Sequence, residues 1–193
     1  MKNLDYMIHN SKLICILDTN VIHPIVIRDI LFWFASYDLY IPKWSKHIFD
    51  EWKTLMKRKN VPKFEIERRI SKAHQAFPDA KVKNYESLVE NITLPDLKDR
   101  HIVAAATKSK ANIIITHNLK DFPNDYLAIY RLEARSPDDF LSEIIELNPS
   151  ISVKAFKSLV LNRNNPSINE FEILEILKNN HLMNTADCLY NLL

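Results

Sequence analysis

The 193-residue chain contains no glycine at all. An average protein has about 7% glycine, so this absence excludes the motifs that use glycine to bring the backbone close to phosphate groups. Neither a GxGxxG dinucleotide fingerprint nor a phosphate-binding P-loop is present. Any chemistry on phosphate must therefore depend on metal ions and side chains. The turns must use Asn, Asp and Pro instead.

Cysteine is scarce and long apolar runs are missing. Cys15 and Cys188 both lie in apolar patterns, which predicts two small buried residues rather than a disulfide. No apolar run approaches the roughly 18–20 residues that a membrane-spanning helix needs. Asp5, His9 and Asn10 interrupt the short apolar run near the N-terminus, so this run lacks the layout of a signal peptide. We therefore predict a cytoplasmic protein with no membrane partner.

The charges are nearly balanced overall but unevenly distributed. The net charge is +2, and 47% of the residues are hydrophobic, as in an ordinary globular chain with a core. Residues 1–135 carry 22 basic and 16 acidic side chains, whereas residues 136–193 carry 4 basic and 8 acidic ones. The densest basic stretch runs from Lys53 to Arg69. Such a stretch suits a polyanion such as RNA, although a solvated helix face is the more common explanation.

Strands and helices alternate in the first part of the chain. Apolar runs predict buried strands at residues 13–17, 112–116 and 127–132. Helical patterns cover residues 25–37, 46–59, 62–76, 98–110 and 136–147. Ser45 and Ser136 are expected to cap the helices that follow them, and Pro42 is expected to mark a break in the chain.

This alternation predicts an α/β protein with a parallel sheet flanked by helices. From about residue 136 onward the pattern is helical only. We therefore predict one α/β domain at residues 1–135 and a C-terminal helical extension at residues 136–193 that packs on it.

Four acids are placed to meet at one edge of this sheet. Asp18 directly follows the first predicted strand, and Asp121 lies five residues after the strand at residues 112–116. Asp99 is in the first turn of the alanine-rich helix, and Glu51 is in the middle of an earlier helix. Ligands of open parallel sheets bind beyond the carboxyl ends of the strands, where these acids are expected.

Clustered carboxylates repel one another unless a cation neutralises them. Ligation by oxygen alone favours Mg²⁺ or Mn²⁺ over Zn²⁺. Such ions activate water for attack on a phosphodiester. The convergence of the four acids would therefore predict a nuclease site that forms no covalent enzyme intermediate.

Each acid also has an ordinary structural explanation. Asp96 and Asp99 have the spacing of a helix-capping pair, and capping is the favoured role for Asp96. Asp18 and Asp121 fit turns, and Glu51 fits a surface ion pair with a lysine of its own helix. Only the joint order of the acids along the chain favours a functional site.

The ordered segments LDTNV, DEW, LPDLKDRHIVAAA and IIITHNLKDFP resemble the PIN-domain family. The segments RSPDDFL and NRNNPSINEFEILEIL resemble the C-terminal part of its VapC-type toxin branch, so the resemblance covers nearly the whole chain. It implies a PIN-like nuclease domain whose metal ligands and catalytic acids are Asp18, Glu51, Asp99 and Asp121. The residues that it implies in supporting roles are Asn20, Asp96, Thr116 and Asn118.

The resemblance implies a Mg²⁺- or Mn²⁺-dependent endoribonuclease that is the toxin of a type II toxin–antitoxin system. RNA would be its substrate, a cognate antitoxin its partner, and a homodimer is compatible with this branch. Two alternatives stay open: a catalytically silent module that binds nucleic acid or a partner, and a phosphotransfer enzyme of the haloacid-dehalogenase or receiver type. The dehalogenase motif needs an acid where Asn20 stands, which counts against that alternative.

Several other polar residues are less specific signals. His101 and His117 flank the predicted site and are interpreted as structural. The three tryptophans have a spacing that fits core packing better than base stacking. The basic residues that are candidates for RNA contact are Lys57, Arg58, Lys59 and Arg100.

Overall fold

The computed structural model describes residues 13–163 and 168–193. The N-terminal residues whose pattern argues against a signal peptide lie outside this description. Among the described residues, a five-stranded, wholly parallel sheet forms the centre of the molecule, in the order β3-β2-β1-β4-β5. Its strands are β1 (Ile14–Leu17), β2 (Ile41–Ser45), β3 (Lys81–Val82), β4 (Ile113–Ile115) and β5 (Glu133–Arg135).

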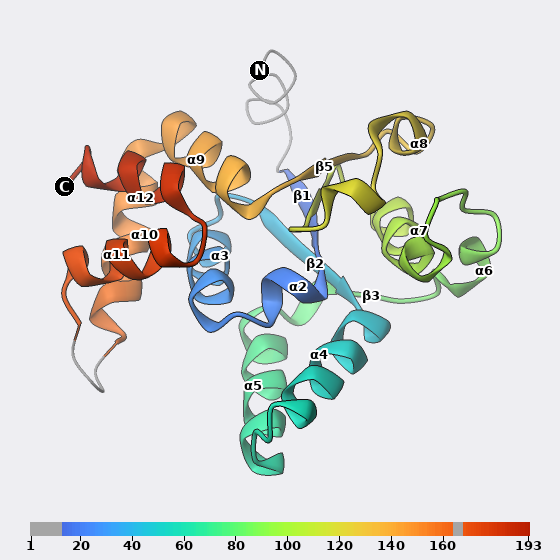
Figure 1. The fold of residues 1–193 in the computed structure, drawn as a ribbon, viewed down its shortest axis with the longest axis horizontal. Coiled ribbons are helices and arrows are strands. Elements are labelled where there is room, and N and C mark those ends of the chain that lie inside the picture. The colour runs from blue at the N-terminus through green and yellow to red at the C-terminus, as the bar shows by residue number, and fades with distance from the viewer. Residues whose placement is uncertain (1–12, 164–167) are drawn as a thin grey trace.

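Helices surround this sheet, and the predicted α/β class is confirmed (Figure 1). In the first part of the chain they are α2 (Thr19–Ile22), α3 (Ile25–Ser36), α4 (Lys46–Arg58), α5 (Lys63–Ala76), α6 (Glu86–Val89), α7 (Arg100–Ser109) and α8 (Asn124–Ala128). Short 3-10 helices are η1 (Pro78–Ala80), η2 (Leu97–Asp99) and η3 (Leu119–Asp121). The C-terminal region contains α9 (Pro137–Leu147), α10 (Pro149–Leu161), α11 (Glu170–Asn179) and α12 (Met183–Tyr190).

The central strands are buried because both faces of the sheet are covered. Ile16 of β1 pairs with Ile114 of β4, and both are fully buried. The alanine-rich helix α7 packs against β1, β2 and β4, and the fully buried Ala104, Ala105 and Ala106 allow this close approach. Purely parallel sheets are usually covered on both faces in this way, which explains the continuous apolar runs.

Local signals in the sequence set several helix boundaries. The Ser45 hydroxyl accepts a hydrogen bond from the Ile48 amide at the start of α4, and Ser136 caps α9 through the Asp139 amide, as predicted. Helix α7 ends at Lys110, which has a left-handed conformation at φ 55°. In a chain without glycine, Lys110 takes the position that glycine usually occupies after a helix.

The strand predicted at residues 127–132 is wrong. The structure places these residues at the end of α8 and in the turn that follows it, and the strand is β5 at Glu133–Arg135. Pro123 starts α8, and Leu127 is the buried anchor of this short helix. Arg131 has a positive φ of 56°, so a continuous strand cannot pass through it.

The break expected at Pro42 is also wrong, because Pro42 lies inside β2. Pro42 is opposite Cys15 of β1, and β3 pairs with β2 only further along, at Trp44 and Ser45. No neighbouring strand therefore needs a hydrogen bond from the Pro42 nitrogen, so this proline is tolerated within the sheet.

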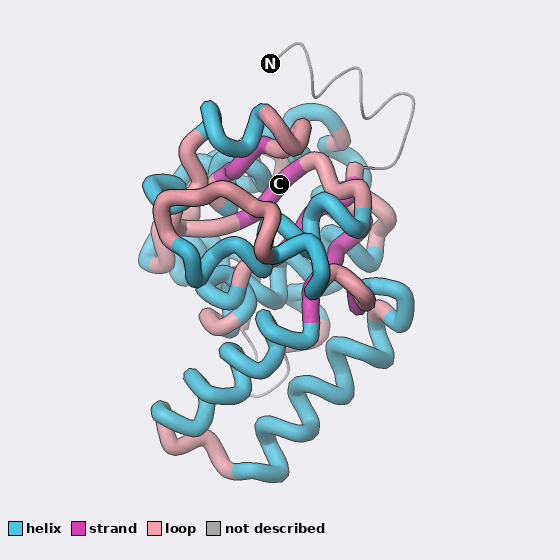
Figure 2. Tube along the Cα trace, turned by 90° about the vertical axis from the view of Figure 1, so that its right-hand side faces the viewer, coloured by secondary structure: helices cyan, strands magenta, loops and turns pink. Residues whose placement is uncertain are grey.

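The C-terminal helices pack against one side of the α/β body (Figure 1). Helix α10 packs on α3, and the Tyr40 ring meets the Phe140 ring edge to face at 5.0 Å. The Tyr37 and Ser158 hydroxyls are 2.6 Å apart. Helices α4 and α5 form a pair that projects away from the rest of the molecule (Figure 2).

Both cysteines are free, as the sequence predicted. Cys15 is buried as expected, whereas Cys188, which was also expected to be buried, is half-buried. Among the described residues, no helix is both long enough and apolar enough to cross a membrane.

Candidate functional site

Asp18 is the most deeply buried acid of the candidate site, at 7% exposure. It follows β1, the central strand, and is the N-cap residue of α2. One carboxylate oxygen accepts a hydrogen bond from the Thr19 amide at 2.6 Å. The other accepts from Asn20 Nδ2 at 2.6 Å and from the Thr116 hydroxyl at 2.7 Å. These bonds fix the carboxylate at the carboxyl edge of the sheet.

Asn20 and Thr116 also bind each other and the loop after β4. Asn20 Nδ2 lies 2.9 Å from Thr116 Oγ1, and Asn20 Oδ1 accepts from the His117 amide at 3.0 Å. Thr116 Oγ1 accepts from the Asn118 amide at 3.0 Å. The residues after β1 and after β4 are therefore held together by their side chains, as residues that support an acidic site would be.

Glu51 faces the same region from α4. One of its oxygens accepts a hydrogen bond from the Thr19 hydroxyl, and the other lies 3.5 Å from His101 Nε2 and 3.7 Å from His47 Nε2. The sequence reading did not single out Thr19 or His47, although Thr19 stands in the DTN segment. His101 is buried, at 4% exposure, and lies beside the Glu51 carboxylate. The sequence predicted only a structural role for His101, so this position next to a candidate site acid was not expected.

Asp96, Asp99 and Asp121 form a second group of acids. Each offers a carboxylate oxygen within 4.8 Å of those of the other two. Asp96 caps η2 through the Lys98 amide at 2.9 Å, in agreement with its favoured role. Asp99 occupies the N-cap position of α7, but its side chain makes no capping bond. The Asp99 carboxylate is therefore available for another purpose.

Asp121 is held by Asn118, whose side-chain amide donates a hydrogen bond to its carboxylate. Asp121 ends η3, the short helix that begins after Asn118. Thr116 and Asn118 therefore connect the two groups of acids, since the first contacts Asp18 and the second contacts Asp121.

Burial and mutual repulsion shift the pKa values of these acids. Burial raises the pKa of Asp18. Burial, together with the charges of Asp18, Asp96 and Asp121, raises the pKa of Asp99 to about 6. Burial alone would raise the pKa of Glu51, but the His101 imidazole and the Thr19 hydroxyl hold it below its ordinary value. The dependence of Asp99 on three other carboxylates is the electrostatic sign of a convergent acidic cluster.

A cavity of about 510 Å³ opens onto the acids. Asp18, Glu51 and Asp99 all line it, and a carboxylate oxygen of Asp121 lies within 4.8 Å of one of Asp99. The structure thus brings the four predicted acids to one edge of the sheet.

The candidate RNA-contacting residues do not all line the cavity of the acids. Arg58 lines the cavity of the acids, whereas Lys57 lines another cavity, together with Lys53 and Lys63. Burial and then the charge of Lys59 lower the pKa of His23, which places Lys59 near His23. These three residues therefore have different surroundings.

Arg100 opens α7 and is half-buried. Within the described part of the chain, its Nε atom is buried and has no hydrogen-bond partner. This nitrogen is not positioned to bind a substrate in solvent.

The chemistry of the donor set fits a hard divalent cation. Carboxylate oxygens from Asp96, Asp99 and Asp121 are close enough to share an ion, and a cation would remove the repulsion that raises the Asp99 pKa. His47, Glu51 and His101 form another group with ligand atoms within 4.8 Å.

The histidine rings do not favour a metal in that second group. The His47 and His101 rings are stacked at 3.8 Å with only 6° between their planes. A metal binds an imidazole nitrogen in the plane of its ring, so one ion cannot bind both rings in this arrangement. The carboxylates are therefore the better candidate for the metal.

Comparisons with known proteins agree with this arrangement. The family model described as PIN domain matches residues 15–120, and the model described as VapC50 C-terminal domain matches residues 137–191. A curated relative from Mycobacterium tuberculosis (strain H37Rv) is named "Putative ribonuclease VapC50" and is 50% identical over 50 residues. This match spans 26% of the present chain and 30% of the relative. No solved structure matches the chain.

Proposed function

Because the chain belongs to the PIN-domain family, we propose that it is a metal-dependent endoribonuclease. The matches to the PIN domain and to the VapC50 C-terminal domain confirm the resemblance to VapC-type proteins that the sequence suggested. The named ribonuclease matches over less than a third of its own length.

The observation that carries this proposal is the electrostatic state of Asp99. Its carboxylate makes no capping bond, and burial with three neighbouring acids raises its pKa to about 6. A structural role would not need an acid at a position where its charge is opposed by its neighbours. Binding of a cation, by contrast, does need a negatively charged side chain at such a position.

We assign the metal to Asp18, Glu51, Asp99 and Asp121, with Mg²⁺ or Mn²⁺ as the ion. Asp99 belongs both to the cavity that Asp18 and Glu51 line and to the group of close carboxylates that also contains Asp121 and Asp96, so Asp96 is a neighbour of this set. When bound, the cation supplies an activated water and neutralises charge on the phosphodiester. The four acids are also the catalytic residues in this proposal. Glu51, whose pKa is lowered, is ionised and ready to bind at neutral pH.

The other residues orient these acids. Asn20 and Thr116 hold the Asp18 carboxylate, and Asn118 holds Asp121. Asp96 adds negative charge beside Asp99 while it caps η2. We propose that these residues keep the acids close together when the metal is absent, so that less rearrangement is needed on binding.

We further propose that the protein is a cytoplasmic toxin of a type II toxin–antitoxin system. Its partner would be a cognate antitoxin, and its substrate would be RNA. Support comes from the match to the VapC50 C-terminal domain and from the ribonuclease in the name of the curated relative. Expression of the chain with and without a protein encoded by the adjacent gene tests this role. We expect the chain alone to arrest growth, and we expect co-expression of the protein encoded by the adjacent gene to relieve this arrest.

A cleavage assay tests the nuclease proposal. The wild-type protein should cut RNA with Mg²⁺ or Mn²⁺ and should stop when EDTA is added, and Asp99→Asn should be inactive. Asp79→Asn is a matched control, because Asp79 is exposed in η1 before β3, at the opposite edge of the sheet. Full activity of Asp99→Asn would overturn the assigned site. A folded wild type that binds RNA but never cuts it would instead favour a silent binding module.

A further inference from the structure

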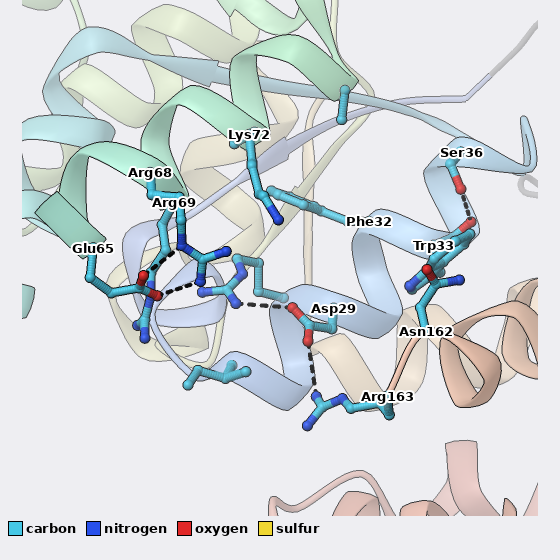
Figure 3. Close-up of a pocket in the computed structure, with 14 residues that line it drawn as sticks. Asp29, Phe32, Trp33, Ser36, Glu65, Arg68, Arg69, Lys72, Asn162 and Arg163 are labelled. Atoms are coloured by element: carbon cyan, nitrogen blue, oxygen red, sulfur yellow. Dashed lines mark hydrogen bonds and ion pairs between the residues drawn. The ribbon is translucent and has the colours of Figure 1, made fainter. Parts of the chain in front are cut away.

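A second cavity, of about 610 Å³, lies between α3, α5 and the residues that follow α10 (Figure 3). It shares no lining residue with the cavity of the acids. Its size is within the range of about 300–1,000 Å³ that is usual for small-molecule sites.

Basic side chains dominate the wall of this cavity. The side chains of α3 and α5 face each other across it, and Arg163 closes it from the C-terminal side (Figure 3). The basic residues are Arg28, Arg68, Arg69, Lys72 and Arg163. Among the described residues, Asp29 and Glu65 are the acids that line the same cavity, so the described lining has an excess of three positive charges.

The two acids hold the guanidinium groups in place without using all of their donors. Asp29 accepts from Arg28 Nη2 at 3.0 Å and from Arg163 Nη2 at 2.9 Å. Glu65 accepts two bonds from Arg68, at 2.6 and 2.7 Å, and one from Arg69 Nε at 2.7 Å. Each acid therefore serves two arginines and fixes their orientation, as in a prepared anion site.

Lys72 offers a donor that is open to a ligand, because its exposed ammonium has no hydrogen bond or ion pair among the described residues. Arg28 Nη1 also has no hydrogen-bond partner within those residues, but this atom is buried, so it adds positive charge beside the cavity rather than an accessible donor. Burial and the nearby charges of Arg69 and Arg163 lower the pKa of Arg28, although Asp29 partly offsets them. An additional anion would relieve this concentration of positive charge.

We propose that this cavity binds a small nucleotide through its phosphate groups. One carboxylate would leave most of the excess charge unbalanced, whereas a diphosphate brings two or more negative charges and several acceptor oxygens. Planar guanidinium groups match such oxygens well. Phe32 and Trp33 line the same cavity and are both half-buried, so the exposed parts of their rings add apolar surface beside the basic groups.

Calorimetric titration of the full chain with ADP, in EDTA and at low salt, tests this site. The measurement needs neither metal nor RNA cleavage, so its outcome is independent of the proposed nuclease activity. Pyrophosphate and adenosine serve as the two separate parts of the ligand. ADP should bind more tightly than either part, and added salt should weaken it.

Two variants of α5 locate the binding. Lys72→Gln should bind ADP roughly three- to tenfold more weakly, because it removes one phosphate donor. Lys63→Gln is the matched control, since it makes the same change in charge on the same helix but outside this cavity. Both residues are exposed, so both variants should fold. Wild-type affinity of Lys63→Gln together with weaker binding of Lys72→Gln would support the proposal.

Four results would overturn it: no ADP binding, equal effects of the two substitutions, no effect of Lys72→Gln, or ADP that binds no better than pyrophosphate. Displacement of ADP by a short RNA without terminal phosphates would also overturn it, because the cavity would then be part of an RNA path.

Discussion

Thr116 shows how one side chain supports an acid without being one. Its hydroxyl donates to Asp18 and accepts from Asn20 and from the Asn118 amide. Thr116 is fully buried, so none of these bonds can be replaced easily by water. The pKa of Asp18 is raised by burial and lowered again by this hydroxyl, so Thr116 favours the charged form that a metal requires.

Thr116→Val should therefore affect both stability and metal binding. The variant keeps the shape of the side chain but leaves buried polar groups unsatisfied, which should destabilise the fold by about 1–3 kcal/mol. Urea denaturation measures this loss, and Mn²⁺ titration should show weaker binding. Thr107→Val is the control, since the Thr107 hydroxyl donates to the Val103 carbonyl within its own helix, α7. Equal metal affinity in Thr116→Val and wild type would contradict the supporting role.

The raised pKa of Asp99 predicts a dependence of stability on pH in the metal-free protein. The folded-state pKa of about 6 lies above the ordinary value of 3.8, so the folded state binds the proton more strongly. The stability due to this proton is complete below pH 3.8 and is lost as the pH rises through 6. In EDTA, Asp99→Asn should melt at a higher temperature than wild type at pH 7.5 and at the same temperature near pH 3.5.

Saturating Mg²⁺ should reverse this order at pH 7.5, because only the wild type gains stability from the bound ion. Melting curves at both pH values, with and without the ion, make the comparison. A lower melting temperature of Asp99→Asn in EDTA at pH 7.5 would show that the Asp99 charge stabilises the fold, and our account of the cluster would then be wrong.

At the scale of single elements, Glu65 stabilises α5 through its own helix. It accepts hydrogen bonds from Arg68 and Arg69, three and four residues later, and these hold its pKa at about 2. The ordinary value is 4.5, so the folded state favours the charged form. The contribution is present above pH 4.5 and is lost as the pH falls through 2.

Glu65→Gln should therefore be less stable than wild type at pH 7, and this difference should shrink steadily between pH 5 and pH 2. Denaturant unfolding across this range measures it, and high salt should reduce it because the pair is near the surface. Glu67→Gln, on the same helix, should have little effect, since its contact with Lys63 is long at 3.9 Å and exposed. A pH-independent difference for Glu65→Gln would point to lost packing rather than lost charge.

Whether the sequence predicts an element depends on how local its cause is. Strands β1 and β4 are predictable because they are buried on both faces and leave continuous apolar runs. The caps at Ser45 and Ser136 are predictable because they depend on bonds only three residues away. By contrast, β2 contains a proline, which is tolerated because β3 pairs with β2 only beyond it. Strand β5 has no fully buried residue, so it leaves no apolar run in the sequence. The pairing of β2 and β5 with the other strands depends on contacts with residues far away in the sequence, so their local sequences do not reveal it.

The candidate site follows the same rule. The order of the acids along the sequence predicted that Asp18, Glu51, Asp99 and Asp121 meet at one edge of the sheet. This was possible because the direction of the parallel strands determines where their carboxyl ends lie. Thr19 and His47 contact Glu51 only through the way α2, α4 and the sheet pack, so no local pattern reveals them. The rotation of α4 likewise decides that Arg58, and not Lys57, faces the acids.

At the scale of the whole molecule, the C-terminal helices and the α/β body share an interface. Phe156 of α10 is fully buried, and Arg163 bonds to Asp29 of α3. We propose that residues 1–135 form the nuclease domain and that residues 136–193 form an extension that does not fold separately from it.

Phe156→Ala should then destabilise the entire protein, by about 3–5 kcal/mol. All three tryptophans lie within residues 1–135, so their fluorescence reports the body, while far-UV circular dichroism reports every helix. Both signals should shift together to lower urea concentration. If the fluorescence transition stays at its wild-type midpoint while circular dichroism shifts, the extension unfolds on its own and the proposal fails.

The distribution of charge over the whole molecule leads to a test of the RNA path. The body carries 22 basic and 16 acidic side chains, but only Arg58 of the three adjacent basic residues lines the acidic cavity. RNA bound at the acids should therefore contact Arg58, and Arg58→Gln should reduce the slope of log affinity against log salt by about 0.7, the value for one phosphate on a single strand. Lys57→Gln should leave the slope unchanged, because Lys57 lines a different cavity. Both variants belong in an Asp99→Asn background, so that the RNA stays intact. Equal reductions for the two variants would mean that RNA binds the α4–α5 pair as a general basic surface, and the path to the acids would have to be drawn along the cavity of Lys57 as well.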